Sequence, residues 1–229
     1  MNPAWSQQVN EQGFAVVPEV LSRRVVLEFL ETLQHIPIRR TRAGIRHALA
    51  CSAVADFVHR EEIMGMAREI LGPGALPFRA SLFEKSPEAN WLVAWHQDTA
   101  LPLREWSNDP DWGPWSAKQD ILYAHAPARA LARVLALRIS LDDSTSLNGS
   151  LRVLPATHTL GVLSEDRIRQ LTAETPAVEC PVPQGGVLAM RPLLLHASSK
   201  SRSNSPRRVL HVEFAPSALI ALGFELAIA

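Results

Sequence analysis

The chain has 229 residues, 47% of them hydrophobic, which is enough to bury a sizeable core in one large or two small domains. Lys+Arg and Asp+Glu both number 23, so the charge balance favours neither a nucleic acid nor an anionic membrane as a partner. The sequence has no apolar stretch of transmembrane length and no visible signal peptide, and its two cysteines, Cys51 and Cys180, lack a CxxC pairing, so we expect a protein of the reducing cytoplasm.

Two helices are expected in the first third of the chain. Ser22 can cap a helix from Arg23 to His35, whose apolar stripe ends before Pro37. Ser52 can cap a second helix that runs to Leu71, followed by the helix-stopping pair Gly72-Pro73.

From about residue 76 the sequence changes to short apolar runs separated by Pro, Gly, Asn and Asp, which is typical of strands and turns. The expected strands are Ala80–Glu84, Trp91–His96, Val134–Leu141, Leu151–Leu154, Val187–Met190 and Val209–Phe214. A short helix is expected from Glu165 to Leu171, with Ser164 as its cap. Helices first and strands later predict an α+β, mainly β chain around a sandwich or barrel.

The segment that starts at Thr99 fits neither pattern, because it carries prolines and tryptophans without any periodicity. Long irregular segments in compact domains are usually functional loops or lids. We therefore expect residues 99–120 to form a wall of the active site, with at least one of Trp106, Trp112 and Trp115 lining the substrate pocket.

His96 and Asp98 are the first candidate metal ligands. In a strand, residues i and i+2 point to the same face, so both side chains can hold one ion while Gln97 points away. His196 ends the apolar run Leu193–Leu195 and can bring a third ligand from another strand. Two imidazoles and one carboxylate leave one face of the ion open, which suits Fe(II) that must bind an organic cosubstrate and O2 together. The alternative is that each histidine is a structural residue at a strand end and binds no metal.

Arg207 is the candidate anion-binding residue. It follows His196 by eleven positions and lies at the start of an expected strand, where a buried guanidinium is costly unless it meets an anion. A dicarboxylate cosubstrate would supply that anion and accept a bidentate contact. Arg208 is the alternative, since neighbours on a strand face opposite ways and only one of the two arginines can point inward.

Taken together, these motifs resemble the phytanoyl-CoA dioxygenase family. The matching segments are Leu82–Pro87, Trp95–Asp98, Leu141–Asp143, Asn148–Pro155 and His196–Ser198 with Arg207. The resemblance covers residues 80–216 and implies a double-stranded β-helix, that is a jelly-roll or cupin-like barrel, with N-terminal helices packed outside. It implies a single oxygenase domain over residues 1–229, with a helical lead-in (1–75) and a barrel core (76–216).

Carried over position by position, the resemblance implies that His96, Asp98 and His196 bind iron. It also implies a set of contacts to 2-oxoglutarate, in which an arginine binds the distal carboxylate and a serine assists. The implied cosubstrate contacts are Arg207, Ser198, Lys85 and Trp115.

The implied activity is that of an Fe(II)- and 2-oxoglutarate-dependent dioxygenase, which uses O2 to hydroxylate a small organic substrate and releases succinate and CO2. The carboxylate of Asp98 favours hydroxylation over halogenation, because halogenating relatives lack it, while desaturation and ring closure stay open as alternatives. The fold and the metal site do not name the substrate. No basic cluster suited to a CoA diphosphate is evident in the sequence, and the oligomeric state stays open.

Two other function classes remain as alternatives. A cupin-type isomerase or hydrolase with another metal would need no buried arginine for a dicarboxylate, and succinate release that depends on O2 would separate it from an oxygenase. A catalytically silent module on the same fold would bind neither Fe(II) nor 2-oxoglutarate.

Several further polar residues have ordinary structural explanations. The alternative for Lys85 is that it is a surface lysine and does not contact the cosubstrate. His47 is expected on the surface, and Tyr123, the only tyrosine, in a structural position. At His211 some relatives have a serine near the cosubstrate, so the details of that pocket stay open.

Overall fold

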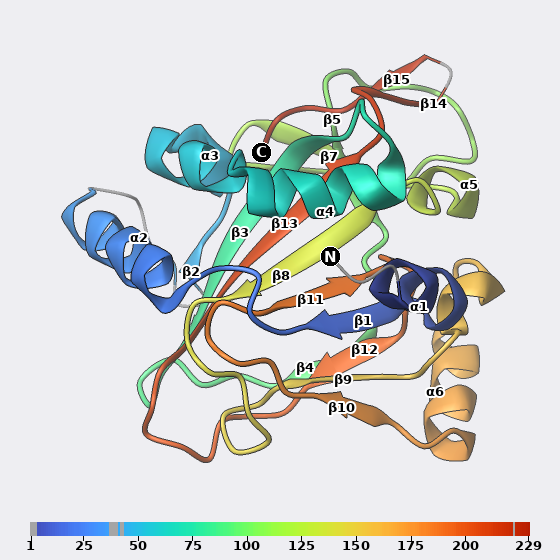
Figure 1. The fold of residues 1–229 in the computed structure, drawn as a ribbon. Coiled ribbons are helices and arrows are strands. Elements are labelled where there is room, and N and C mark those ends of the chain that lie inside the picture. Colours follow the sequence, from blue (N-terminus) through green and yellow to red (C-terminus); the bar gives the residue numbers. More distant parts are fainter. Residues whose placement is uncertain (1–3, 37–40, 42–43, 222) are drawn as a thin grey trace.

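The computed structural model describes residues 4–36, 41, 44–221 and 223–229, and its core is a pair of antiparallel sheets (Figure 1). The larger sheet has the order β1 (Phe14–Val17), β11 (Val187–Met190), β8 (Leu135–Ser140), β13 (Arg207–Ala215), β3 (Leu76–Lys85), β2 (Gly44–Ile45). The smaller sheet has the order β10 (Val178–Cys180), β9 (Leu151–Val153), β12 (His196–Ser198), β4 (Val93–His96). This arrangement is the predicted double-stranded β-helix, and all six strands expected from the sequence are present.

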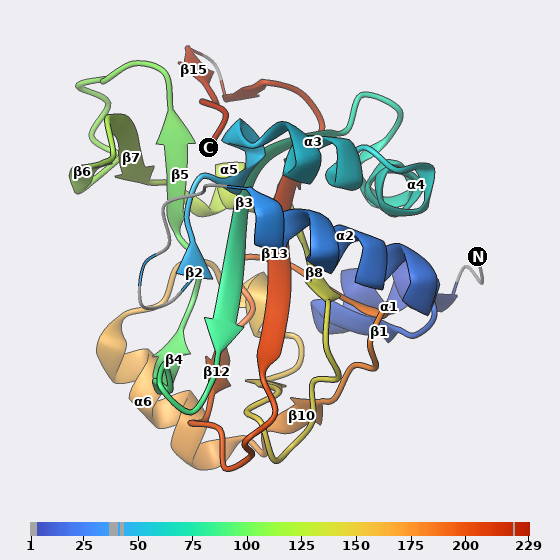
Figure 2. The same cartoon turned by 90° about the vertical axis from the view of Figure 1, so that its left-hand side faces the viewer.

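The outer face of the larger sheet is apolar and covered by helices (Figure 2). These helices are α1 (Ala4–Gln12), α2 (Arg23–His35), α3 (Ser52–Val58) and α4 (Glu61–Leu71). On β13 the side chains of Leu210, Val212 and Phe214 belong to this helix-covered core. Because side chains alternate along a strand, the intervening residues of β13 face the space between the sheets. The prediction of helices packed outside the barrel is confirmed.

The helix α2 has the predicted bounds and cap. The Ser22 side chain accepts a hydrogen bond from the backbone N–H of Val25 at 3.4 Å, as an N-cap serine does. Pro37, the expected stop, lies outside the described residues. Ser164 caps α6 (Glu165–Glu174) in the same way, and this helix runs three residues further than predicted.

The prediction of a single helix that is capped by Ser52 and runs to Leu71 is wrong. The structure has two helices there, and Cys51 is the N-cap of the first, while Ser52 is its first helical residue. Arg60 is in an extended conformation at the N-cap of α4, which separates α3 from α4. Glu61 and Glu62 follow in the first turn of α4, where carboxylates interact favourably with the helix dipole. This acidic pair was the sequence signal for a new helix start, although the apolar pattern continues across it.

The segment 99–120 is irregular in its middle, over residues 104–114, but forms strands on either side of it. It contributes β5 (Ala100–Leu103) and β6 (Trp115–Lys118), which pair with β7 (Ile121–His125) in a third sheet. Gln119 and Asp120 both have positive φ, 51° and 64°, and join β6 to β7 as a two-residue hairpin. Tight hairpins need this conformation, but they usually signal it with Asn-Gly or Asp-Gly, so the hairpin was not evident in the sequence.

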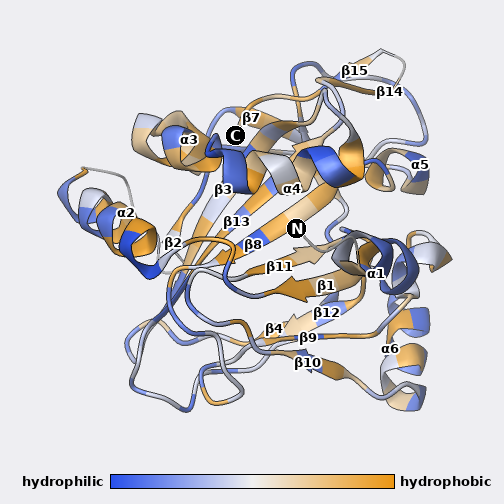
Figure 3. Cartoon of the chain, viewed as in Figure 1, coloured by the Kyte–Doolittle hydropathy of each residue, from blue (hydrophilic) through white to orange (hydrophobic). Residues whose placement is uncertain are grey.

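The remaining elements lie at the ends of the barrel. They are the 3-10 helices at Ala48–Ala50 and Thr157–Leu160, α5 (Ala128–Leu131), β14 (Leu219–Ala221) and β15 (Phe224–Glu225). Hydrophobic residues dominate the strands of the larger sheet, whereas α6 alternates hydrophobic and hydrophilic residues along its length (Figure 3). No helix among the described residues is both long and apolar enough to cross a lipid bilayer.

Candidate metal centre and cosubstrate cavity

A cavity of about 380 Å³ lies between the two sheets and contains the predicted metal ligands. Its walls come from β2, β3, β8 and β13 of the larger sheet and from β4, β9 and β12 of the smaller one. His96, Asp98 and His196 all line it, as do Lys85, Ser198 and Arg207. Six of the seven predicted site residues are therefore brought together in one cavity.

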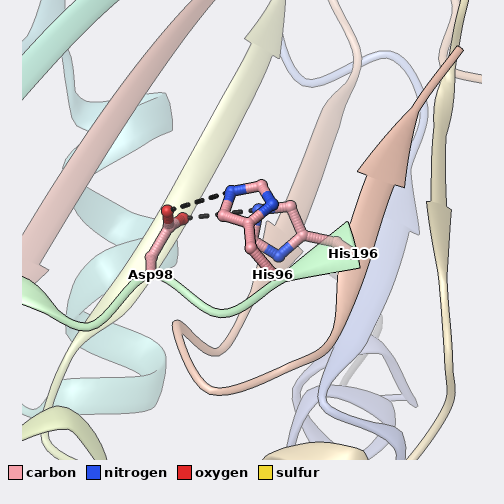
Figure 4. A group of neighbouring side chains, drawn as sticks. All are labelled: His96, Asp98 and His196. Atoms are coloured by element: carbon pink, nitrogen blue, oxygen red, sulfur yellow. Dashed lines mark ion pairs between the residues drawn. The ribbon is translucent and has the colours of Figure 1, made fainter. Parts of the chain in front are cut away.

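The three candidate ligands converge at the junction of β4 and β12 (Figure 4). His196 lies directly opposite His96 in the antiparallel strand pair. The Nε2 atom of each ring is 3.6 Å from a different carboxylate oxygen of Asp98. Ligand atoms held at about 2.1 Å from one ion lie roughly 3 to 4 Å from one another, so this spacing suits a shared metal.

Backbone hydrogen bonds fix which nitrogen of each ring is offered to a metal. The Nδ1 atom of His96 is 2.8 Å from the Ala94 carbonyl oxygen, and that of His196 is 2.9 Å from the Leu194 carbonyl oxygen. A ring that donates from Nδ1 to a carbonyl keeps a lone pair on Nε2, which is the usual arrangement of a metal-bound histidine. Both lone pairs then point toward Asp98.

The electrostatics keep the carboxylate charged and the buried imidazole neutral. Burial would raise the pKa of Asp98, but His196 and His96 outweigh it and hold that pKa well below its usual range. Burial lowers the pKa of His196 to about 4, so this ring is neutral near pH 7 and free to act as a ligand. His96 and Asp98 are partly open toward the cavity, which leaves one face of the cluster accessible.

Gln97 points away from the metal cluster, as the strand alternation predicted. Its side chain holds this part of the backbone in place through hydrogen bonds on the opposite face. Its side-chain amide donates to the carbonyls of Gly161 and Leu193 at 2.8 and 2.7 Å. Its oxygen accepts from the backbone N–H of Leu163 at 2.8 Å. The residue between the two ligands is thus fixed by three hydrogen bonds to two loops.

We expect Gln97→Ala to lower the free energy of unfolding by about 3 kcal/mol, because it leaves buried backbone groups without partners. Urea denaturation followed by circular dichroism measures this. The exposed Gln7, which bonds only to Glu11, provides the matched control, and Gln7→Ala should change the stability by no more than about 0.5 kcal/mol. Equal effects of the two substitutions would contradict the anchoring role.

A second group of possible ligands, Asp98, His211 and Glu213, shares the Asp98 carboxylate. The carboxylate of Glu213 is already engaged in an ion pair with Arg79. Arg138 lies 3.1 Å from Nδ1 of His211 and can only donate, so that nitrogen accepts and the proton of the neutral ring is on Nε2. Neither residue therefore offers a free lone pair of the right kind, and the cluster of two histidines and Asp98 is the better metal site.

The structure places the two candidate arginines on opposite faces of β13. Arg207 is 3% exposed and lines the cavity, and its Nε atom has no hydrogen-bond partner among the described residues. Burial and the nearby Arg138 lower its pKa to about 10. Arg208 instead makes a bidentate ion pair with Asp142 at 2.7 and 2.8 Å.

Lys85 and Ser198 lie beside Arg207 at the same end of the cavity. Lys85 is opposite Arg207 in the β3–β13 pair, and its Nζ donates to Ser198 Oγ at 2.8 Å and to the Ser199 carbonyl at 2.6 Å. Burial, Arg207 and Arg138 lower the pKa of Lys85 to about 7. Lys85 is 1% exposed, so its alternative as a surface lysine is excluded.

The tryptophans of the predicted wall lie elsewhere. Trp112 stacks on Phe224 at 4.1 Å between ring centroids, and Trp115 packs at the edge of the same apolar cluster. Trp106 is largely exposed beside Trp115. Trp115 is therefore not among the residues that line the cavity, whereas Trp91 is.

A comparison of the sequence with models of protein families shows the family of this chain. The family model of phytanoyl-CoA dioxygenase (PhyH) matches residues 9–209. The chain belongs to the phytanoyl-CoA dioxygenase family. A search of curated proteins finds no matching sequence.

Solved structures similar to this member of the phytanoyl-CoA dioxygenase family confirm its fold. EctD from S. alaskensis, with 2-oxoglutarate and 5-hydroxyectoine, has a TM-score of 0.72 at 17% identity over 95% of this chain and 77% of EctD. The epimerase SnoN, in complex with Fe3+, alpha ketoglutarate and nogalamycin RO, has a TM-score of 0.71 at 18% identity over 94% of this chain and 83% of SnoN. AviO1 from Streptomyces viridochromogenes Tue57 has a TM-score of 0.67 at 23% identity over 94% of this chain and 95% of AviO1.

The cofactors of the phytanoyl-CoA dioxygenase family, iron, 2-oxoglutarate and O2, fit the residues that are present. The cluster of His96, Asp98 and His196 supplies one carboxylate and two imidazoles around an open face, the donor set that non-heme Fe(II) takes. Arg207 is buried, its Nε has no hydrogen-bond partner in the described part of the chain, and a guanidinium of this kind can pair with a carboxylate.

Three cavity residues were missed or misjudged from the sequence. Arg138 interrupts the apolar strand Leu135–Ser140, and an arginine inside such a strand was the available signal for an inward-facing cation. His47 and Tyr123 also line the cavity, and Nε2 of His47 is 2.8 Å from the Tyr123 hydroxyl. Nothing in their local sequence indicates this, because their segments meet only in the folded chain.

Proposed function

We propose that the protein is an Fe(II)- and 2-oxoglutarate-dependent dioxygenase that hydroxylates a small organic substrate. The observation that carries the proposal is the buried Arg207, which lies in one cavity with the cluster of His96, Asp98 and His196. A cation buried without a partner is costly for folding, and its presence beside a metal cluster supports a dicarboxylate as the missing partner.

His96, Asp98 and His196 would hold the iron through Nε2, a carboxylate oxygen and Nε2. When bound, iron and 2-oxoglutarate would supply the oxidising chemistry. In the overall reaction 2-oxoglutarate loses CO2 and becomes succinate, one oxygen atom of O2 enters succinate, and the other is inserted into a substrate C–H bond. The chain's own contribution is to position the reactants and to keep water out. The two Nδ1–H groups that donate to backbone carbonyls hold both rings in the ligating orientation.

Arg207 would bind the distal carboxylate of 2-oxoglutarate, with Lys85 and Ser198 beside it. Ser198 Oγ donates to the Gly149 carbonyl at 2.8 Å and so accepts from Lys85, which aligns the ammonium group. Arg138, between this end and the metal cluster, adds positive charge along the path of the cosubstrate. Trp115 is left out of this set because it does not line the cavity.

Succinate formation that depends on O2, Fe(II) and an added substrate tests this function. Pools of small metabolites are screened for a compound that stimulates succinate release, and the product is analysed for a mass gain of one oxygen atom. A cupin-type isomerase or hydrolase would turn over a substrate without succinate. A catalytically silent module would bind neither metal nor cosubstrate, and either result would replace the proposal.

Lys85 provides a pH prediction for cosubstrate binding. Its pKa of about 7 in the free cavity should rise when a dianion binds beside it, so binding should take up a proton at about pH 8. The affinity for 2-oxoglutarate should accordingly fall as the pH rises above 7. Calorimetric titrations in buffers of different ionisation enthalpy count the protons.

Lys85→Met should abolish this proton uptake, whereas Lys200→Met, at an exposed position, should preserve it. Uptake that is unchanged in Lys85→Met would assign the proton to another group. The same titrations report whether 2-oxoglutarate binds at all, so they also bear on the main proposal.

The setting of the enzyme forms part of the proposal. Cys51 and Cys180 are both free thiols, which supports the reducing cytoplasm as its compartment. We also propose that residues 1–229 act as one oxygenase domain, since helices of the lead-in share an apolar core with the larger sheet.

A further inference from the structure

A second basic group lines the cavity and is called here the outer basic cluster: Arg46, Arg79 and Lys118, gathered around Tyr123. Lys118 Nζ lies 4.9 Å from the centroid of the Tyr123 ring, and Arg79 Cζ lies 5.8 Å from it. The Tyr123 hydroxyl is 2.8 Å from Nε2 of His47, the residue that follows Arg46. Lys118 and Arg79 thus lie beside one aromatic ring, and Arg46 lies next to the residue that contacts its hydroxyl.

Only one member of the outer basic cluster has an acidic partner among the described residues. Arg79 forms an ion pair with Glu213, whereas Arg46 and Lys118 meet no carboxylate in the described part of the chain. The sequence offers none close to Arg46, since residues 32–55 contain no Asp or Glu. Burial, Arg46 and Arg79 all lower the pKa of Lys118, so like charges lie close together here and only that of Arg79 meets a carboxylate among the described residues.

The outer basic cluster adjoins the metal centre on the side away from Arg207. Along β3 and β13 the cavity-facing pairs run from Lys85 and Arg207 at one end to Arg79 and Glu213 at the other. This is six residues of strand, or roughly 20 Å. The carboxylate of Asp98 lies within 4.8 Å of ligand atoms of both His211 and Glu213, so the metal cluster lies between the two ends and nearer to Arg79 than to Arg207.

A dicarboxylate that reaches from Arg207 to the metal cluster therefore leaves the outer basic cluster unused. We propose that the substrate is a small organic acid whose carboxylate or phosphate group binds between Arg46 and Lys118, with its reacting C–H bond beside the metal centre. Ile45, which lines the cavity next to Arg46, supplies an apolar contact for the carbon skeleton. This inference rests on the proposed function and names the substrate class of the same site.

Binding of simple anions near the metal tests the proposal without knowledge of the substrate. The protein is loaded with Mn(II) and saturating 2-oxoglutarate, and the paramagnetic relaxation of inorganic phosphate and of acetate is measured by NMR, with methanol as the neutral probe. We expect relaxation of at least one anion well above that of methanol. Phosphate as the stronger ligand indicates a phosphate ester, and acetate indicates a carboxylic acid.

Arg46→Gln and Lys118→Gln should each weaken anion binding roughly tenfold, because each removes one charge-assisted contact. Both residues are exposed, so the variants should fold normally. Arg23→Gln, on the exposed side of α2, is the matched control and should behave as wild type. Anion relaxation no greater than that of methanol, or equal in wild type and in the double variant, would overturn the proposal.

The same samples show separately whether the proposed function itself fails. If Mn(II) and 2-oxoglutarate do not bind, calorimetry shows this directly. The anion site is then measured in the metal-free protein by the line broadening of phosphate and acetate, with the same variants and the same expected order. The substrate-class inference is thus supported or overturned whether or not the metal site forms.

Discussion

Asp98→Ala should reduce succinate formation by more than roughly a hundredfold, because it removes the only carboxylate of the candidate metal cluster. The carboxylate oxygens of Asp98 are 3.6 Å from Nε2 of both His96 and His196, and no other acid among the described residues has the same relation to this pair. Glu213 cannot take its place, since it is paired with Arg79. The loss should appear both in turnover and in the affinity for Fe(II).

Two further variants make the result for Asp98 specific. Asp56→Ala, at an exposed position of α3, should leave succinate formation as in wild type. Added formate, which can occupy the space of the missing carboxylate, should restore part of the activity of Asp98→Ala. Full coupled activity of Asp98→Ala without formate or chloride would remove Asp98 from the ligand set.

Arg207→Ala should raise the KM for 2-oxoglutarate by roughly thirtyfold or more, whereas Arg208→Ala should raise it by no more than about threefold. The reason is the direction of the two side chains. Arg207 is buried in the cavity and its Nε has no partner among the residues that the structure describes, whereas Arg208 is ion-paired with Asp142. Initial rates of succinate formation at varied 2-oxoglutarate concentration measure both values.

The two substitutions should also affect the free energy of unfolding differently. Arg207→Ala removes a buried charge that has no protein partner, so the free energy of unfolding of the protein without cosubstrate should stay equal or rise. Arg208→Ala leaves Asp142 unpaired at a half-buried position and should lower it by about 1 kcal/mol. The reverse order in either measurement would exchange the roles of the two residues.

The metal cluster was predictable because its information is local. His96 ends β4 and Asp98 follows it by two residues, and the alternation of an extended chain puts both side chains on the same face and Gln97 on the other. The position of Arg207 followed from its spacing and from the cost of burying a cation. These features depend on the backbone of single strands, which the sequence pattern predicts well.

The outer part of the cavity was not predictable, because it depends on how distant segments meet. His47 lies in a left-handed conformation after the short strand β2, and Lys118 ends β6 beside an unusual hairpin turn. Neither segment has a periodic pattern that fixes its direction. For the same reason the basic cluster that seemed absent from the sequence appears only when Arg46, Arg79 and Lys118 are brought together around Tyr123.

The central claim is that one cavity holds a metal ion and 2-oxoglutarate together. The most direct measurement is an anaerobic calorimetric titration of 2-oxoglutarate into the protein with and without Mn(II), which binds like Fe(II) but resists oxidation. We expect one 2-oxoglutarate per chain in the presence of the metal, with binding weakened strongly when the metal is left out and in Arg207→Ala. Equal binding with and without metal, or no binding in either case, would contradict the account.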